Sequence, residues 1–194
     1  MNKQILEVSE KIKKDMSEKR YQHTLGVMYT CACLAMKYNY DVEKAMWAGL
    51  LHDIAKRFSD EEMLKKCKKH GISISENEEK APYLLHGKLG AYYAKKKYDI
   101  TDEEILDAIS YHTTGRPGMG TLSCILFIAD YTEPSRKEIT GLKEVRECAF
   151  NVGLIEAVIM KIENVLSYLE KSSKNIDDMT MKTYLYFKED KKYE

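Results

Sequence analysis

Long apolar runs and helix-breaking residues are scarce in this sequence. Its 194 residues include only three prolines, and no internal repeat or low-complexity linker divides them. The longest apolar stretch, residues 124–129, is far too short to span a bilayer. The first twenty residues also lack the apolar centre that a signal peptide needs. We therefore expect a cytoplasmic protein without a membrane partner, folded as one domain over residues 1–194.

The sequence also lacks a net charge and a disulfide framework. Lysine plus arginine equals aspartate plus glutamate at 31 each, so the formal net charge is zero. A general nucleic-acid binder would usually show a basic excess, so we expect no nucleic-acid partner, although a locally positive pocket is still allowed. The five cysteines are odd in number and lie mostly in apolar helical patterns, which is typical of reduced core residues. Cys31 and Cys33 make only a weak metal-thiolate motif, because no second pair follows them.

Helical periodicity is present along almost the whole chain. Between residues 21 and 38, apolar or small residues recur at Val27, Cys31, Leu34 and Tyr38, in steps of four, three and four. No run alternates convincingly over five residues, although residues 184–187 are ambiguous. A long amphipathic stretch covers about residues 142–169, and the glycine-rich segment 115–120 must be a loop. The sequence therefore predicts an all-α fold, a single helical bundle of seven to nine helices.

Capping patterns mark the ends of several expected helices. Ser59 followed by Glu62 has the capping-box pattern, and Thr101 followed by Glu104 repeats it. Gly71 is expected to end the helix that Ser59 opens.

Histidine is rare, with five residues in all, and its placement is informative. His52 and Asp53 follow the apolar run 48–51, where adjacent side chains on a helix point about 100° apart. The two side chains can therefore bind the same ligand only if it lies near the helix end or is large enough to contact two faces of the helix. Two metal ions bridged by Asp53 meet that requirement. Asp130 likewise follows the apolar run 125–129 and needs a partner. The candidate metal ligands are His23, His52, Asp53, His86, His112 and Asp130.

The ligand types restrict the choice of metal. Imidazoles and carboxylates without thiolates suit iron, manganese or zinc better than magnesium or calcium. A satisfied core or surface residue is the alternative for any single histidine, but four of them on separate helical segments argue against it jointly. His23 is expected to open its helix. His70 is the exception, because it lies at a polar helix terminus where the helix dipole stabilises a solvated side chain.

The ordered ligand set resembles that of the HD-domain metal phosphohydrolases. The closer match is to the YqeK-type branch, the symmetrical diadenosine tetraphosphate hydrolases, and it runs over about residues 20–169. The segments that carry the resemblance are 23–27 (HTLGV), 49–56 (GLLHDIAK), 112–117 (HTTGRP) and 129–136 (ADYTEPSR).

This resemblance implies a fold, a cofactor and an activity. The fold would be an all-α HD domain with a metal-binding core at about residues 20–170 and a helical tail at 171–194. The cofactor would be two divalent metal ions, most readily iron, with manganese, cobalt or zinc as alternatives. The activity would be the cleavage of diadenosine tetraphosphate, a small-molecule nucleotide, into two ADP. Similar proteins suggest a homodimer, and Met160 and Tyr168 could line its interface, although core burial explains them equally well.

Two departures from the family pattern are visible. Ser135 stands where the family usually has glycine, and Lys182-Thr183 stands where it tends to have an Arg-Asn pair. Lysine lacks the planar bidentate grip of arginine on a phosphate. The resemblance therefore does not carry over the substrate contacts of the C-terminal segment.

The expected mechanism needs no serine or cysteine nucleophile, because a two-metal site lowers the pKa of a bridging water and orients it for in-line attack. We expect Asp53 and Lys56 to be the catalytic residues. Arg57 is expected to be a solvated surface charge. The candidate substrate contacts, each a short spacing from a metal ligand, are Lys56, Thr113, Thr114, Arg116 and Arg136.

Three other functions fit parts of the pattern. The chain could be another HD nucleotide phosphohydrolase, such as a deoxynucleotide phosphatase or a guanosine alarmone hydrolase. It could be a catalytically silent metal- or nucleotide-binding regulatory module, although such modules often lose a ligand. A purely structural helical protein is the third alternative, and metal analysis would exclude it.

Overall fold

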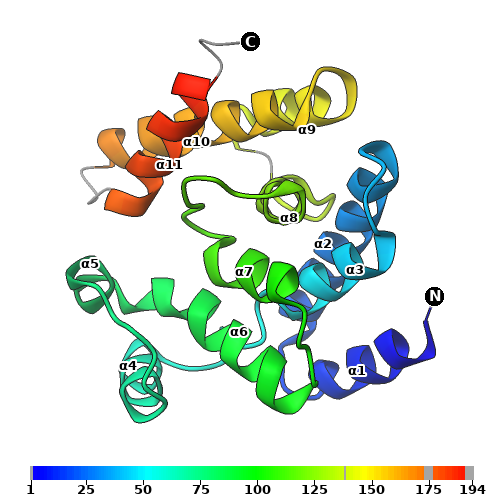
Figure 1. Ribbon diagram of the computed structural model, residues 1–194, viewed down its shortest axis with the longest axis vertical. Helices are drawn as coiled ribbons and strands as arrows, with labels where there is room; N and C mark the ends of the chain where they lie inside the picture. Colours follow the sequence, from blue (N-terminus) through cyan, green and yellow to red (C-terminus); the bar gives the residue numbers. More distant parts are fainter. Residues whose placement is uncertain (1, 138, 173–176, 191–194) are drawn as a thin grey trace.

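The computed structural model describes residues 2–137, 139–172 and 177–190. Within these ranges it contains α-helices, one short 3-10 helix and no strand, as the sequence predicted (Figure 1). The described residues form eleven α-helices rather than seven to nine, and two of the differences are a helix in the N-terminal segment and the division of the expected stretch 142–169. Their bounds are α1 (Lys3–Lys13), α2 (Glu18–Lys37), α3 (Val42–Leu51), α4 (Asp60–Lys69), α5 (Glu76–Lys80), η1 (Pro82–Leu85), α6 (His86–Lys97), α7 (Glu103–Tyr111), α8 (Thr121–Thr132), α9 (Leu142–Asn151), α10 (Leu154–Lys171) and α11 (Asp178–Asp190).

Helix α8 lies near the centre of the molecule, with α2, α3 and α7 packed against it (Figure 1). Helices α2 and α3 form the most extensive pair, and Gly49 allows their close approach. A Cβ atom at Gly49 would lie 2.7 Å from Cα of Met28 on α2. One large cluster of buried apolar side chains, from Ile5 in α1 to Phe187 in α11, joins these helices. The ends of α2, α3, α7 and α8 therefore lie in fixed positions relative to one another.

The C-terminal helices α9 and α10 pack against one side of α8, and α11 packs against α10 (Figure 1). The amphipathic stretch expected at about residues 142–169 is two helices, so this detail of the prediction was wrong. The backbone of Gly153 is extended at φ −173° and caps the start of α10, which stops the helical hydrogen bonding of α9. The ambiguous residues 184–187 are helical and belong to α11.

The expected helix ends are partly confirmed. Ser59 and Glu62 form the predicted capping box, and Gly71 adopts a left-handed φ of +68° after α4. At α7 the cap is Asp102 rather than Thr101, because its carboxylate accepts from the backbone of Glu104 and Ile105. His23 does not open its helix. Ser17 caps α2, which places His23 in the second turn.

The described helices differ from membrane-spanning segments, since none combines the length and apolar character that crossing a bilayer requires. The five cysteines are free thiols, and all except Cys33 are buried, as the apolar pattern around them predicted.

Candidate metal centre and its surroundings

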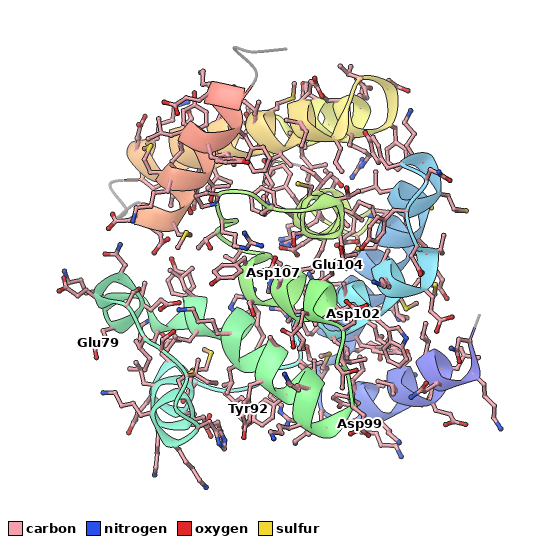
Figure 2. All side chains as sticks on the ribbon, viewed as in Figure 1. Glu79, Tyr92, Asp99, Asp102, Glu104 and Asp107 are labelled. Atoms are coloured by element: carbon pink, nitrogen blue, oxygen red, sulfur yellow. The ribbon has the colours of Figure 1, made fainter. Side chains whose placement is uncertain are left out.

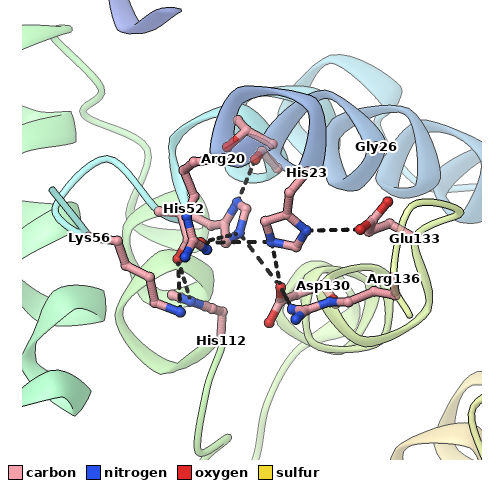
Figure 3. Close-up of polar contacts among 12 residues, drawn as sticks. Arg20, His23, Gly26, His52, Lys56, His112, Asp130, Glu133 and Arg136 are labelled. Carbon is pink, nitrogen blue, oxygen red and sulfur yellow. Dashed lines mark hydrogen bonds and ion pairs between the residues drawn. The ribbon is translucent and has the colours of Figure 1, made fainter. Parts of the chain in front are cut away.

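All six predicted ligands converge in the interior of the molecule. Figure 3 labels His23, His52, His112 and Asp130 among them. Each comes from a helix or from a turn at a helix end: His23 from α2, His52 and Asp53 from the turn after α3, His86 from the start of α6, His112 from the turn after α7, and Asp130 from the last turn of α8.

The Asp53 carboxylate lies between two pairs of histidines. Its Oδ2 atom is 3.4 Å from Nε2 of His52 and 3.7 Å from Nε2 of His23. Its Oδ1 atom is 3.5 Å from Nε2 of His86 and 3.6 Å from Nε2 of His112. The two oxygens of one carboxylate therefore face two separate groups of nitrogen atoms.

Asp130 completes the first of these groups. Its Oδ1 atom is 3.1 Å from Nε2 of His23 and 3.7 Å from Nε2 of His52. Two sets of residues bring their ligand atoms close enough to hold an ion, and they share His52: one is His23, His52 and Asp130, and the other is His52, Asp53 and His112.

The backbone fixes which nitrogen of each histidine faces the cluster. Nδ1 of His52 lies 2.8 Å from the carbonyl oxygen of Gly49, and Nδ1 of His112 lies 2.7 Å from that of Ile109. His86 makes the same contact to the carbonyl of Tyr83, again three residues earlier. Because a carbonyl oxygen only accepts, Nδ1 carries the proton in each ring, and neutral Nε2 has a lone pair for a ligand.

Three buried polar atoms of the cluster have no hydrogen-bond partner among the described residues. Among the described residues, Nε2 of His23, Nε2 of His52 and Oδ1 of Asp53 are buried without a hydrogen bond. Buried polar atoms normally find a partner, and unsatisfied ones point to a missing ion or ligand. Imidazole nitrogens and carboxylate oxygens fit a divalent transition metal, so the donor set matches the group that would satisfy these atoms.

The protonation states also suit a metal site. Burial would raise the pKa of Asp53, but the neighbouring His52 and His112 imidazoles and the Lys56 ammonium group hold it well below its usual value. Burial lowers the pKa of His86 to about 3 and also lowers that of His112. The carboxylate is therefore ionised and these two imidazoles are neutral, as metal binding requires.

Two polar residues that the sequence reasoning missed surround the cluster. Arg20 on α2 donates from Nη1 to Oδ2 of Asp53 at 2.6 Å. Glu133 accepts from Nδ1 of His23 at 3.0 Å, and Ser135 donates to it from both its backbone nitrogen and its hydroxyl. Gly26 leaves the space for this carboxylate, since a Cβ there would lie 2.4 Å from its Oε2 atom (Figure 3).

The sequence contained a signal for Arg20 but not for the pairing of Glu133 with His23. Arg20 precedes His23 by three, so both lie on one face of α2. Glu133 follows Asp130 by three, but its pairing with a residue 110 positions earlier was not visible in the sequence. Ser135, noted above as a departure from the family pattern, contributes its hydroxyl to this contact.

Three of the expected substrate contacts lie beside the cluster. Nζ of Lys56 is 3.7 Å from Oδ1 of Asp53, and Nη2 of Arg136 is 2.6 Å from Oδ1 of Asp130. Oγ1 of Thr113 is 3.2 Å from Nε2 of His86.

Arg116 and Thr114 make other contacts. The Arg116 guanidinium donates from Nε and Nη2 to both carboxylate oxygens of Asp107 on α7, at 2.8 and 3.0 Å, and from Nη1 to the carbonyl oxygen of Pro117. The Thr114 hydroxyl donates to the carbonyl oxygen of Gly115 at 3.0 Å. Asp107, the partner of Arg116, lies on α7 (Figure 2).

Two residues that the sequence analysis set aside do lie apart from the cluster. His70 stacks on Tyr92 of α6, with ring centroids 4.4 Å apart. The Arg57 side chain forms an ion pair with Asp15 in the turn after α1.

Known proteins are similar to this chain in both sequence and fold. A family model described as HD domain matches residues 20–135. Relatives named symmetrical bis(5'-nucleosyl)-tetraphosphatase are 39% identical in Halalkalibacterium halodurans and 39% in Bacillus subtilis, each over 89% of this chain and 91% of the relative. A solved structure from Clostridium acetobutylicum, described as a "predicted HD superfamily hydrolase involved in NAD metabolism", has a TM-score of 0.89 and 39% identity, covering 93% of this chain and 95% of that one. The chain therefore belongs to the HD domain family, in the group that includes relatives named symmetrical bis(5'-nucleosyl)-tetraphosphatase.

Proposed function

We propose that this chain hydrolyses diadenosine tetraphosphate symmetrically, giving two ADP, at a centre of two divalent metal ions. The observation that carries the proposal is the Asp53 carboxylate, whose two oxygens face separate pairs of histidine nitrogens. A carboxylate in that setting suits a bridge between two ions. The names of the relatives, at 39% identity over most of both chains, support the choice of substrate.

The six convergent residues would divide between the two ions according to their distances. One ion would be held by His23, His52 and Asp130, the other by His86 and His112, and both by Asp53. When bound, such ions act as Lewis acids and lower the pKa of an attacking water. Water then adds across the central anhydride: the bond between the second and third phosphates breaks, and each half of the substrate leaves as ADP.

The cations beside the cluster would bind the phosphate chain. Lys56 and Arg136 each sit within ion-pair distance of a carboxylate of the cluster. We assign Lys56 a catalytic role, in which its ammonium group stabilises charge on the leaving diphosphate. Thr113 and Thr114 offer hydroxyl groups to the same phosphates. We assign Arg116 an indirect part, because its guanidinium donates to Asp107 and Pro117 and thereby shapes the loop that follows His112.

The finer features expected from the sequence are part of the same proposal. We propose iron as the native metal, replaceable by manganese, cobalt or zinc, because imidazole and carboxylate ligands suit all four. We also propose a cytoplasmic homodimer, with Met160 and Tyr168 of α10 at the interface, that acts on a nucleotide and not on nucleic acid. The whole chain is proposed to be one domain, with a metal-binding core at residues 20–170 and a helical tail at 171–194.

Product analysis tests the central proposal. Purified protein supplied with iron, manganese or cobalt should convert diadenosine tetraphosphate to ADP alone, as separated by chromatography, with metal content measured on the same sample. The appearance of ATP together with AMP would contradict symmetrical cleavage, since that pair requires attack at a different phosphate. If the protein hydrolysed only deoxynucleotides or guanosine alarmones, it would belong to another class of HD hydrolase. Bound metal without any phosphate product would indicate a regulatory module.

A further inference from the structure

A cleft lined by residues of η1, α10 and α11 lies close to the metal centre. It consists of two cavities of about 180 Å³ each, and both are lined by Asn77, Leu84, Thr113 and Thr114. Thr113 connects the cleft to the cluster, because its Oγ1 atom lies 3.2 Å from Nε2 of His86.

Tyr83, on another side of the cleft, also contacts His86. Tyr83 lines one of the two cavities, and its backbone carbonyl accepts from Nδ1 of His86. The Tyr83 side chain is 53% exposed, although it is a large aromatic ring next to a candidate metal ligand. Both ring nitrogens of His86 therefore contact residues of the cleft, which places the cleft next to the metal centre.

The chemistry of the cleft changes along its length. Near the cluster it presents the hydroxyl groups of Thr113 and Thr114. One of its two cavities is also lined by the apolar side chains of Leu84, Val165 and Leu169 and by the exposed Tyr83, together with Lys80, Asp177 and Thr180. An apolar wall that carries an aromatic ring suits a flat ring that stacks. The Asn77 carboxamide offers both a donor and an acceptor, which is the combination that pairs with the edge of a base.

We propose that this cleft binds one nucleoside of the substrate, with its base stacked on Tyr83 and its phosphates directed past Thr113 to the metal centre. This inference rests on the proposed function, because it assigns a place to one end of a dinucleoside substrate. A cleft for bare polyphosphate would need cations throughout, whereas the cavity beside Tyr83 has one lysine, Lys80, and presents mostly apolar surface.

The test compares nucleotide binding with phosphate binding in variants of Tyr83. Tyr83→Ala should raise the KM for diadenosine tetraphosphate by about 5- to 100-fold, the range for one lost base stack, with a smaller change in kcat. In calorimetry on the metal-loaded protein it should weaken ADP binding to a similar degree and leave pyrophosphate binding unchanged. Tyr83→Phe should restore both values, because it keeps the ring. Tyr29→Ala removes a tyrosine of similar exposure on α2 and should change neither.

Failure of this inference and failure of the proposed function give different results. Unchanged ADP binding in Tyr83→Ala, or an equal loss for ADP and pyrophosphate, would overturn the nucleoside site whatever the enzyme hydrolyses. If diadenosine tetraphosphate were not cleaved but Tyr83→Ala still weakened ADP selectively, the cleft assignment would stand and the proposed reaction would be wrong.

Discussion

At the scale of single residues, Lys161 of α10 has an unusual setting. Its side chain is buried, its Nζ atom donates to the carbonyl oxygen of Phe127 at 2.7 Å, and it lies over the Phe127 ring. Burial lowers the pKa of Lys161 from its usual 10.5 to about 7, with attraction by Asp130 opposing the change and repulsion by Arg136 adding to it. The folded protein therefore releases this proton at a lower pH than the unfolded chain does.

Replacing this lysine should stabilise the protein most at low pH. Below about pH 7 both states hold the proton, so the full cost of burying the charge is present, and it declines as the pH rises from about 7 towards 10.5. At about 1.4 kcal/mol per pH unit that cost is on the order of 4–5 kcal/mol, and the lost hydrogen bond to Phe127 offsets part of it. Lys161→Met should therefore raise the urea midpoint at pH 6 more than at pH 9.

The matched control is Lys171→Met, which changes an exposed lysine near the end of the same helix. It should leave the midpoint nearly unchanged at both pH values. A gain for Lys161→Met that is equal at pH 6 and pH 9 would contradict the buried-charge explanation.

At the scale of helices, the packing of α2 against α3 determines where His52 and Asp53 lie. Gly49 precedes His52 by three residues, and a Cβ there would lie 2.7 Å from Cα and 3.0 Å from N of Met28. Both are backbone atoms, so the clash is relieved only if the helices separate. Gly49→Ala should therefore lower the free energy of unfolding by about 1–3 kcal/mol, as overpacking usually does, and reduce bound metal. Chemical denaturation and metal analysis measure the two effects.

Gly120→Ala serves as the control for this substitution. A Cβ at Gly120 meets nothing within 4 Å, and the residue has an ordinary φ of −74°. The free energy of unfolding of the Gly120→Ala protein should change by no more than about 0.5 kcal/mol. A stable, fully metal-loaded Gly49→Ala protein would show that the two helices tolerate separation.

Individual helices also show where sequence reasoning succeeds and fails. The periodicity around Val27 and Cys31 predicted α2, and acids and histidines at apolar helix ends predicted the convergent cluster. The break at Gly153 was missed, because amphipathic spacing continues across it and only the backbone changes direction. The pairing of His23 with Glu133 was also missed, since a contact between residues 110 positions apart depends on how α2 and α8 pack.

At the scale of the whole molecule, metal binding and folding should be coupled. Elements from α2 to α8 supply the six convergent residues, so an ion at their centre would connect most of the chain. A ligand that binds only the folded state stabilises it by about 2.7 kcal/mol at one hundred times its dissociation constant. The melting temperature should therefore fall after dialysis against a chelator and recover on addition of manganese or iron.

Variants separate this coupling from a general effect of metals. His52→Ala should abolish both the bound metal and the metal-dependent rise in melting temperature, whereas His70→Ala should retain both, because His70 stacks on Tyr92 outside the cluster. Equal loss in the two variants would overturn the ligand set.

The way each histidine is oriented has a consequence for how this protein tolerates mutation over evolutionary time. His52, His86 and His112 donate to carbonyl oxygens of the main chain, and no amino-acid replacement at Gly49, Tyr83 or Ile109 deletes a carbonyl. The orientation of His23 depends instead on the Glu133 side chain, which one codon change can remove. Divergent sequences should therefore preserve three of these ring orientations automatically, while the fourth requires selection to keep an acceptor opposite His23.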